Sequence, residues 1–255
     1  MKLIDTHAHL HFQDFDQDRD EVIRRAREAG MELFITVGSD VVDSEAARKL
    51  SEKYDCIFST VGIHPHDAVH VDESVLQTIQ DLLGSPRVIA IGEVGLDFYR
   101  DLSPRQVQED VLRKFFAIHR EIKKPLVLHC RDAYDQLIHM IEEELRPPCS
   151  GIIHCFSSDR QTLMRLVDLG FYIAFGGALT YKTNDKLREA CQACPPDRLL
   201  LETDAPYLPP QSKRGRRNEP GWLVETAEKM AELHGLDLER IAEVTTRNAK
   251  AVLQL

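Results

Sequence analysis

The sequence lacks the features that mark membrane and secreted proteins. No run approaches the 18 consecutive apolar residues expected of a spanning helix. The first residues run directly into an apolar segment, without the basic region and apolar core of a secretory signal. We therefore expect a cytoplasmic protein that makes no membrane contact. The chain has only 6 cysteines, and Cys191-Gln-Ala-Cys194 has no second CxxC partner, so reduced thiols are expected.

The sequence also lacks an excess of positive charge. It has 32 Lys and Arg against 42 Asp and Glu, a formal net charge of -10. This balance argues against a broad basic face that binds nucleic acid. It does not exclude a phosphate substrate, because bound cations neutralise a carboxylate-rich pocket and basic residues can act locally. The one concentrated basic segment is 213–217, where Arg214 and Arg216 are candidate phosphate contacts. A solvated charged loop is the alternative interpretation.

No linker rich in Pro, Gly or Ser divides the chain, and no repeat appears, so residues 1–255 are expected to form one domain. Short apolar segments alternate with amphipathic helical patterns. Strands are predicted near 3–7, 33–38, 57–62, 88–92, 125–129, 151–155, 171–175 and 199–203. Helices are predicted near 19–29, 41–53, 73–83, 104–123, 132–145, 159–169, 183–193, 220–234 and 238–253.

This alternation predicts parallel strands joined by crossover helices. A doubly wound open sheet would alternate in the same way, but no GxGxxG follows the first strand. Eight strands and this length favour the α/β class and a single (β/α)8 TIM barrel.

Several helix ends carry their own signals. Ser103 before Pro104 predicts an N-cap, and Ser158 repeats the capping pattern. Gly30 and Gly170 stand where left-handed residues end helices.

The opening Asp5-Thr-His-Ala-His-Leu-His11 carries the first chemical signal. Because alternate side chains of a strand share a face, His7 and His9 are expected to point the same way. Two imidazoles at that spacing can hold one metal ion. Alone, the pair could equally be two half-exposed histidines at the end of a strand.

Further candidate ligands stand at the ends of other predicted strands. They are His64, Glu93, His129, His154, Glu202 and Asp204. In a barrel of this type the active site forms at the carboxyl ends of the strands, so these side chains should converge.

Six of these candidates form the expected ligand set: His7, His9, His129, His154, Glu93 and Asp204. Four imidazoles and two carboxylates exceed the ligand set of one catalytic zinc and suit two divalent ions. We expect His7, His9 and Asp204 to hold one ion. His129 and His154 would hold the other, and Glu93 would bridge the pair. Zinc, magnesium and manganese all remain open as the metal. The alternative outside the enzymes is a binding protein whose metals are purely structural.

The remaining polar residues receive secondary roles. Asp204 is expected to orient or deprotonate the attacking water. Asp204 and Glu93 are therefore the two catalytic candidates. His64 and Arg131 are candidate contacts to a phosphate oxygen, although Arg131 could form a salt bridge with Asp132 or Glu93 instead. Glu202 could orient a ligand or complete the shell of an ion, and it is also counted among the substrate-binding candidates. An acid on the surface of the strand is the alternative interpretation.

The motifs together resemble the TatD family of metal-dependent deoxyribonucleases over essentially the whole chain. The resemblance rests on 5–11, Val61-Gly-Ile-His-Pro-His66, Ile91-Gly-Glu-Val-Gly-Leu-Asp97, His129-Cys-Arg-Asp132, Ile153-His-Cys-Phe-Ser157, Leu201-Glu-Thr-Asp-Ala-Pro206, Arg217-Asn-Glu-Pro220 and Thr246-Arg-Asn-Ala249. The family's ligands would map onto His7, His9, Glu93, His129, His154 and Asp204.

The resemblance implies a divalent metal centre and hydrolysis of DNA phosphodiester bonds, commonly 3′ to 5′ on single strands. Nucleic acid is thus the expected partner, with DNA favoured, and no obligate protein partner is evident. The family also includes proteins described as acting on D-aminoacyl-tRNA, so an amide or ester hydrolase with the same metal centre is the alternative.

Overall fold

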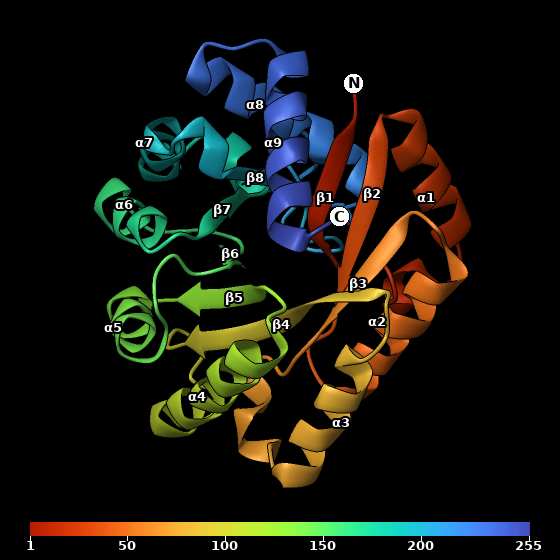
Figure 1. Cartoon of the computed structure of the whole chain (residues 1–255). Coiled ribbons are helices and arrows are strands. Elements are labelled where there is room, and N and C mark those ends of the chain that lie inside the picture. Colours follow the sequence, from red (N-terminus) through yellow and green to blue (C-terminus); the bar gives the residue numbers. More distant parts are fainter.

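A computed structural model describes residues 1–255, and its centre is a barrel of eight parallel strands in sequence order (Figure 1). The strands are β1 (Leu3–Ala8), β2 (Met31–Val37), β3 (Ile57–Val61), β4 (Val88–Asp97), β5 (Leu126–Arg131), β6 (Gly151–Ile153), β7 (Tyr172–Phe175) and β8 (Leu199–Leu201). A parallel bridge between Ala8 and Ala205 joins the end of β1 to the chain after β8. The predicted single (β/α)8 barrel is therefore confirmed.

Nine helices surround or close the barrel. They are α1 (Arg19–Glu28), α2 (Val41–Lys53), α3 (Glu73–Leu83), α4 (Arg105–Ile122), α5 (Tyr134–Glu144), α6 (Arg160–Asp168), α7 (Asp185–Ala193), α8 (Leu223–His234) and α9 (Leu238–Leu253). Each lies where the apolar periodicity predicted it, with ends that differ by a few residues at most. None of the helices combines the length and the apolar composition that a membrane crossing needs.

Two of the predicted helix caps are wrong. The Ser103 hydroxyl donates to the His66 carbonyl at 2.7 Å and accepts from the Val69 amide, so it ties the loop after β3 to the start of α4 and caps no helix. At α6 the cap is Asp159, whose carboxylate accepts from the backbone N–H of Thr162 at 2.8 Å. The Ser103 hydroxyl is thus engaged by backbone groups of the segment after β3, and at α6 the neighbouring Asp159 takes the capping position.

The predicted helix ends at Gly30 and Gly170 are confirmed. Both residues adopt positive φ, +102° and +103°, directly after the last turn of α1 and α6. A side chain is strained in this conformation, which is why glycine follows these helices.

The interior of the barrel forms its own small core. It contains Ile4, Ile35, Val37, Ala90, Val127, Ile152, Ala174 and Leu200 from the strands, together with Ala249, Val252 and Leu253 from α9. The end of α9 therefore closes the barrel from the amino-terminal ends of the strands, and Figure 1 shows this helix beside β1 and β8. A separate core of 58 residues fills the space between strands and the outer helices.

Asn248 connects this closing helix to the barrel wall. Its buried amide donates to the carbonyls of Pro196 and Leu199, at 2.8 and 2.9 Å. These carbonyls precede or begin β8, the short strand that leads to the residues after position 201. The amide thus fixes the entry of the last strand against α9.

We predict that Asn248→Ala lowers the free energy of unfolding by about 1–3 kcal/mol, because the buried Leu199 carbonyl and the part-buried Pro196 carbonyl lose their donor. Urea denaturation measures the change. Gln77→Ala is the matched control, since Gln77 lies exposed on α3 and contacts only Asp81. A loss for Asn248→Ala no larger than that of the control would contradict the assigned role.

Candidate metal centre

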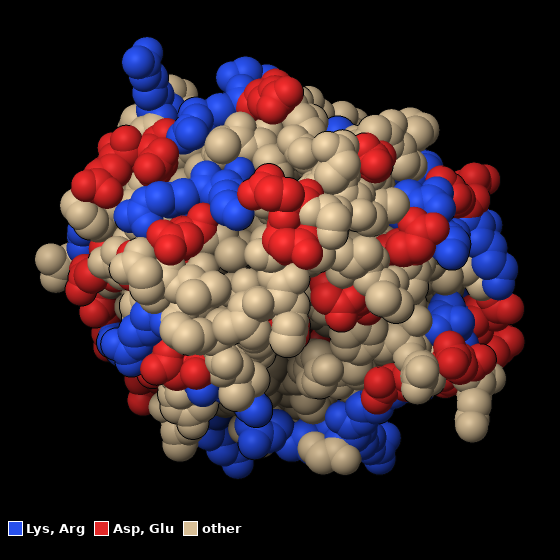
Figure 2. All heavy atoms as spheres, turned by 90° about the horizontal axis from the view of Figure 1, so that it is seen from below, with Lys and Arg blue, Asp and Glu red and all other residues tan.

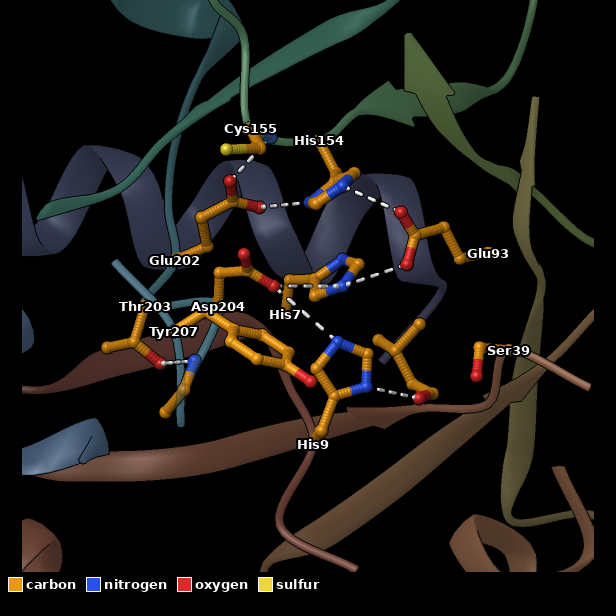
Figure 3. A network of polar contacts seen from close by, with 12 residues as sticks. His7, His9, Ser39, Glu93, His154, Cys155, Glu202, Thr203, Asp204 and Tyr207 are labelled. Carbon is orange, nitrogen blue, oxygen red and sulfur yellow. Dashed lines mark hydrogen bonds and ion pairs between the residues drawn. The ribbon is translucent and has the colours of Figure 1, made fainter. Parts of the chain in front are cut away.

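The predicted ligands converge at the carboxyl ends of the strands. His7 is fully buried, and His9, Glu93 and His154 are each 4% exposed. Figure 3 shows His7, His9, Glu93, His154 and Asp204 pointing toward one another, and they stand in or directly after β1, β4, β6 and β8. The chain thus brings together side chains up to about two hundred residues apart, as the barrel geometry requires.

One set of ligand atoms surrounds Nε2 of His7. This nitrogen lies 3.5 Å from Glu93 Oε2 and 3.7 Å from Asp204 Oδ1. His9 Nε2 lies 3.5 Å from the same Asp204 oxygen. The ligand atoms of His7, His9 and Asp204 all lie within 4.8 Å of one another, as a single ion requires.

A second set surrounds the other oxygen of Glu93. Oε1 lies 2.8 Å from both His129 Nδ1 and His154 Nε2, which are 3.4 Å apart. His64 Nε2 lies 3.6 Å from the same oxygen, and the ligand atoms of His64, Glu93 and His129 are within 4.8 Å of one another. Glu93 consequently presents one oxygen to each set, the arrangement expected of a bridging carboxylate.

The donor atoms fit divalent metals. Both ring nitrogens of His7 are buried and have no hydrogen-bond partner in the protein. Two atoms that each lie 2.0–2.2 Å from a tetrahedral ion are roughly 3.3–3.6 Å apart, close to the 3.5–3.7 Å measured around His7. A buried donor or acceptor left unpaired costs about 1–3 kcal/mol, which a bound cation would remove.

The two carboxylates are held in their charged form. Burial raises the pKa of Glu93, but His154, His64 and His129 outweigh it and hold the pKa well below its usual value. Burial likewise raises the pKa of Asp204, whereas His9, His7 and His154 lower it to a net decrease. Two anionic carboxylates are thus available to cations at neutral pH.

Local irregularities in the strands aim these side chains. The pairing register shifts between Asp5 and Ala8 in β1 and between Ile91 and Val94 in β4. Between Glu93 and Asp97, Gly95 adopts φ +151°, and an added Cβ would lie 2.0 Å from the His129 carbonyl oxygen. Only glycine allows this close approach of β4 to β5.

Other groups fix the orientation of the ligands. His9 Nδ1 lies 2.8 Å from the Val37 carbonyl, so Nε2 faces the centre. His129 Nε2 lies 3.2 Å from Asp97 Oδ2, which also contacts His66 Nε2 at 3.0 Å. Glu202 is fully buried, accepts the Cys155 amide and lies 3.6 Å from His154 Nδ1. This position favours the ligand-orienting role of Glu202 over contact with substrate.

The arginines predicted to contact phosphate are exposed to solvent, outside the two buried sets of ligand atoms. Arg131 is exposed and stacks on the ring of Tyr99 at 3.7 Å instead of pairing with Asp132 or Glu93. Arg214 is exposed and lies 4.5 Å from the Tyr181 ring centroid. Arg216 is exposed as well, whereas Arg217 is held by both carboxylate oxygens of Asp18.

Sequence reasoning missed one buried pair beside the centre. His11 Nε2 lies 2.6 Å from Asp43 Oδ1, and its Nδ1 lies 2.8 Å from the Thr36 hydroxyl. Asp43 Oδ2 also accepts from the amide and hydroxyl of Ser39. His11 continues the HxH spacing, which was the available signal, but nothing in the sequence indicates Asp43 as its partner.

A family model described as TatD related DNase matches residues 4–254. The chain belongs to the TatD-related DNase family. It is 39% identical over 253 residues to the metal-dependent hydrolase YabD of Bacillus subtilis, with 99% of each chain covered. It is 34% identical over 255 residues to the 3'-5' ssDNA/RNA exonuclease TatD of Klebsiella pneumoniae, covering 98% of this chain and 97% of that protein.

Solved structures agree with this assignment. The crystal structure of the TatD homologue YJJV from Escherichia coli superimposes with a TM-score of 0.94 at 29% identity, covering 99% of this chain and 98% of that one. The resemblance inferred from the motifs is therefore confirmed, and this TatD-family chain is a metal-dependent hydrolase. The comparisons leave the number and identity of its ions to experiment.

In this TatD-family chain, we predict that Asp97→Asn lowers divalent-metal affinity about 10- to 100-fold, because His129 loses a charged partner. Calorimetric titration of the metal-free protein with Mn²⁺ or Zn²⁺ measures the effect. Asp101→Asn is the control, since Asp101 is exposed in the loop that follows. Equal affinity in both variants, with unchanged circular dichroism, would refute the role of Asp97.

Proposed function

We propose that the protein is a 3′–5′ exonuclease that hydrolyses phosphodiester bonds of single-stranded DNA with two divalent ions. The observation that carries the proposal is the shared Glu93, whose two oxygens face two adjacent sets of ligand atoms. His7, His9 and Asp204 would hold one ion, and His129 and His154 the other, with Glu93 between them. The nuclease names of similar proteins support the choice of substrate.

Ions held there would supply Lewis acidity for the phosphate and lower the pKa of a nearby water. Asp204 is the protein group suited to accept that water's proton, because it is ionised and has one oxygen directed at His7 and His9. Its second oxygen remains free to orient the nucleophile. Glu93 stays anionic and presents one oxygen to each of the two ligand sets.

Substrate recognition is assigned to the rim of the centre. Burial lowers the pKa of His64 to about 3, so this imidazole is neutral and can donate a hydrogen bond to a phosphate oxygen. Arg131 and Arg214 supply positive charge and lie on Tyr99 and Tyr181, whose rings can also stack on bases. Figure 2 shows Lys and Arg interspersed with Asp and Glu on the face seen from below, so that face is not uniformly basic.

Hydrolysis of an aminoacyl-tRNA ester remains the competing activity, because the same ions can polarise a carbonyl. No contact in the site favours it over phosphodiester hydrolysis. The products separate the two: a nuclease releases 5′-nucleotides from an oligonucleotide, whereas a deacylase releases an amino acid and leaves the nucleic acid intact.

We expect Asp204→Asn to bind single-stranded DNA but to cleave it at least a hundredfold more slowly, since the amide cannot accept the water's proton. Fluorescence anisotropy measures binding, and release of labelled nucleotide measures cleavage. Metal content is determined in parallel, so that loss of an ion is distinguished from loss of the base. Cleavage at the wild-type rate would overturn the assignment.

Removal of metal should abolish cleavage, and restoring one of Zn²⁺, Mn²⁺ or Mg²⁺ should recover it. The test is a matrix of chelated protein and restored ions against single-stranded DNA, duplex DNA, RNA and a charged tRNA. Single-stranded DNA should be cut fastest. Undiminished activity in chelator would exclude the metal mechanism, and activity confined to the charged tRNA would select the deacylase.

A further inference from the structure

A small cavity of about 240 Å³ opens beside the metal centre. It lies between the start of α2, the 3₁₀ segment Pro65–His70 after β3, and the start of α3. Its walls are Asp40, Val41, Val42, Ile63, Asp67, His70, Val71 and Val75. These elements follow the carboxyl ends of β2 and β3, so the cavity belongs to the catalytic side of the barrel.

The backbone of His64 separates this cavity from the centre. The His64 N–H donates to the Ser39 carbonyl at 2.7 Å, and its carbonyl accepts from the Asp67 N–H at 2.9 Å. The His64 ring points the other way, 3.6 Å from Glu93. Ile63 and Asp67 therefore line the cavity on one side of a segment whose imidazole faces Glu93 on the other.

The walls combine apolar surface with one free carboxylate. Five of the eight residues are aliphatic, and Val42 at the rim is 80% exposed. The Asp40 side chain caps α2 by accepting from the Asp43 amide. The Asp67 carboxylate, by contrast, makes no hydrogen bond or ion pair within the protein. An apolar slot with one unpaired acceptor suits a flat, partly apolar ligand that carries N–H donors.

Other ligands fit less well. Asp40, Asp67 and His70 are not among the groups whose ligand atoms lie within 4.8 Å of one another, so they do not form a metal site. Two carboxylates repel a phosphate. A volume of 240 Å³ lies below the roughly 300–1,000 Å³ of pockets for drug-sized molecules, which excludes a whole nucleotide or a peptide.

We infer that this cavity binds one nucleobase of the substrate strand, from a nucleotide adjacent to the bond that is cleaved. The inference rests on the proposed nuclease function and adds a base preference to it. Asp67 would accept from an exocyclic amino group, as carboxylates do from cytosine N4. Thymine lacks that amino group, so the cavity should favour cytosine over thymine at this position.

The experiment uses the metal-loaded protein and single-stranded oligonucleotides that differ only at their last two 3′ nucleotides. Each position carries cytosine, thymine or an abasic residue, and kcat/KM is measured for the first bond cut. At one position we expect cytosine to exceed thymine by about three- to tenfold, the range of one ordinary hydrogen bond. The abasic residue should be slower than either base.

Two variants test the walls. Asp67→Ala should bring the ratio of cytosine to thymine close to one, because cleavage of the cytosine oligonucleotide slows more than that of the thymine oligonucleotide. Val42→Ala, at an exposed position that folding tolerates, should reduce the advantage of a base over the abasic residue. Asp132→Asn is the matched control: it removes one exposed charge at the end of β5, outside the cavity, and should leave both ratios unchanged.

The outcomes separate the two claims. Equal rates for all oligonucleotides, unaffected by Asp67→Ala, would overturn the base pocket and leave the nuclease intact. A base preference that persists in Asp67→Ala would assign it to another part of the site. Failure to cleave any oligonucleotide would overturn the proposed function and this inference together.

Discussion

The buried carboxylate of Glu93 is the group on which the rest of the site depends. Its oxygens lie within 2.8–3.6 Å of nitrogens from His7, His64, His129 and His154, which arrive on four different strands or strand ends. An isolated carboxylate in a protein interior carries a desolvation penalty of several kcal/mol. The imidazoles and any bound cations offset that penalty, so the anion and its surroundings stabilise one another.

This mutual dependence explains why the supporting contacts reach so far. Two of the ligands are oriented by hydrogen bonds directed away from the centre, His9 through the Val37 carbonyl and His129 through Asp97. His154 turns its Nδ1 toward Glu202, 3.6 Å away. The rings of His7 and His154 stack with centroids 3.8 Å apart, which joins the two ligand sets. A centre built in this way needs a wall that does not deform, and the packed barrel closed by α9 supplies it.

The order of the elements could be read from the sequence because apolar runs and helical periodicity are local properties. Convergence of the ligands followed from a general rule of barrels, since each residue closes a strand. The direction in which each individual side chain points could not be predicted in this way. Leu3 and Ala8 both pack outside the barrel although five positions separate them, so strict alternation fails within β1. That irregularity arises from pairing with β2 and the chain after β8, partners that no local pattern reveals.

The helix caps and the His11–Asp43 contact were missed for the same reason. Ser103 is a suitable cap by type, but a carbonyl 37 residues away competes for its hydroxyl. His11 and Asp43 are 32 residues apart, and only the folded barrel places the second helix beside the first loop. Residue type thus indicates what a side chain can do, while tertiary neighbours decide which of its possible partners it meets.

The acidity of the molecule limits how it can handle a polyanion. With a net charge of -10, the protein as a whole does not attract nucleic acid from a distance. In the proposed nuclease, attraction would come from cations held at the centre and from exposed arginines such as Arg131 and Arg214. Under the proposed function, the carboxylates that bring the ligand sets together would therefore also confine strand binding to the metal centre.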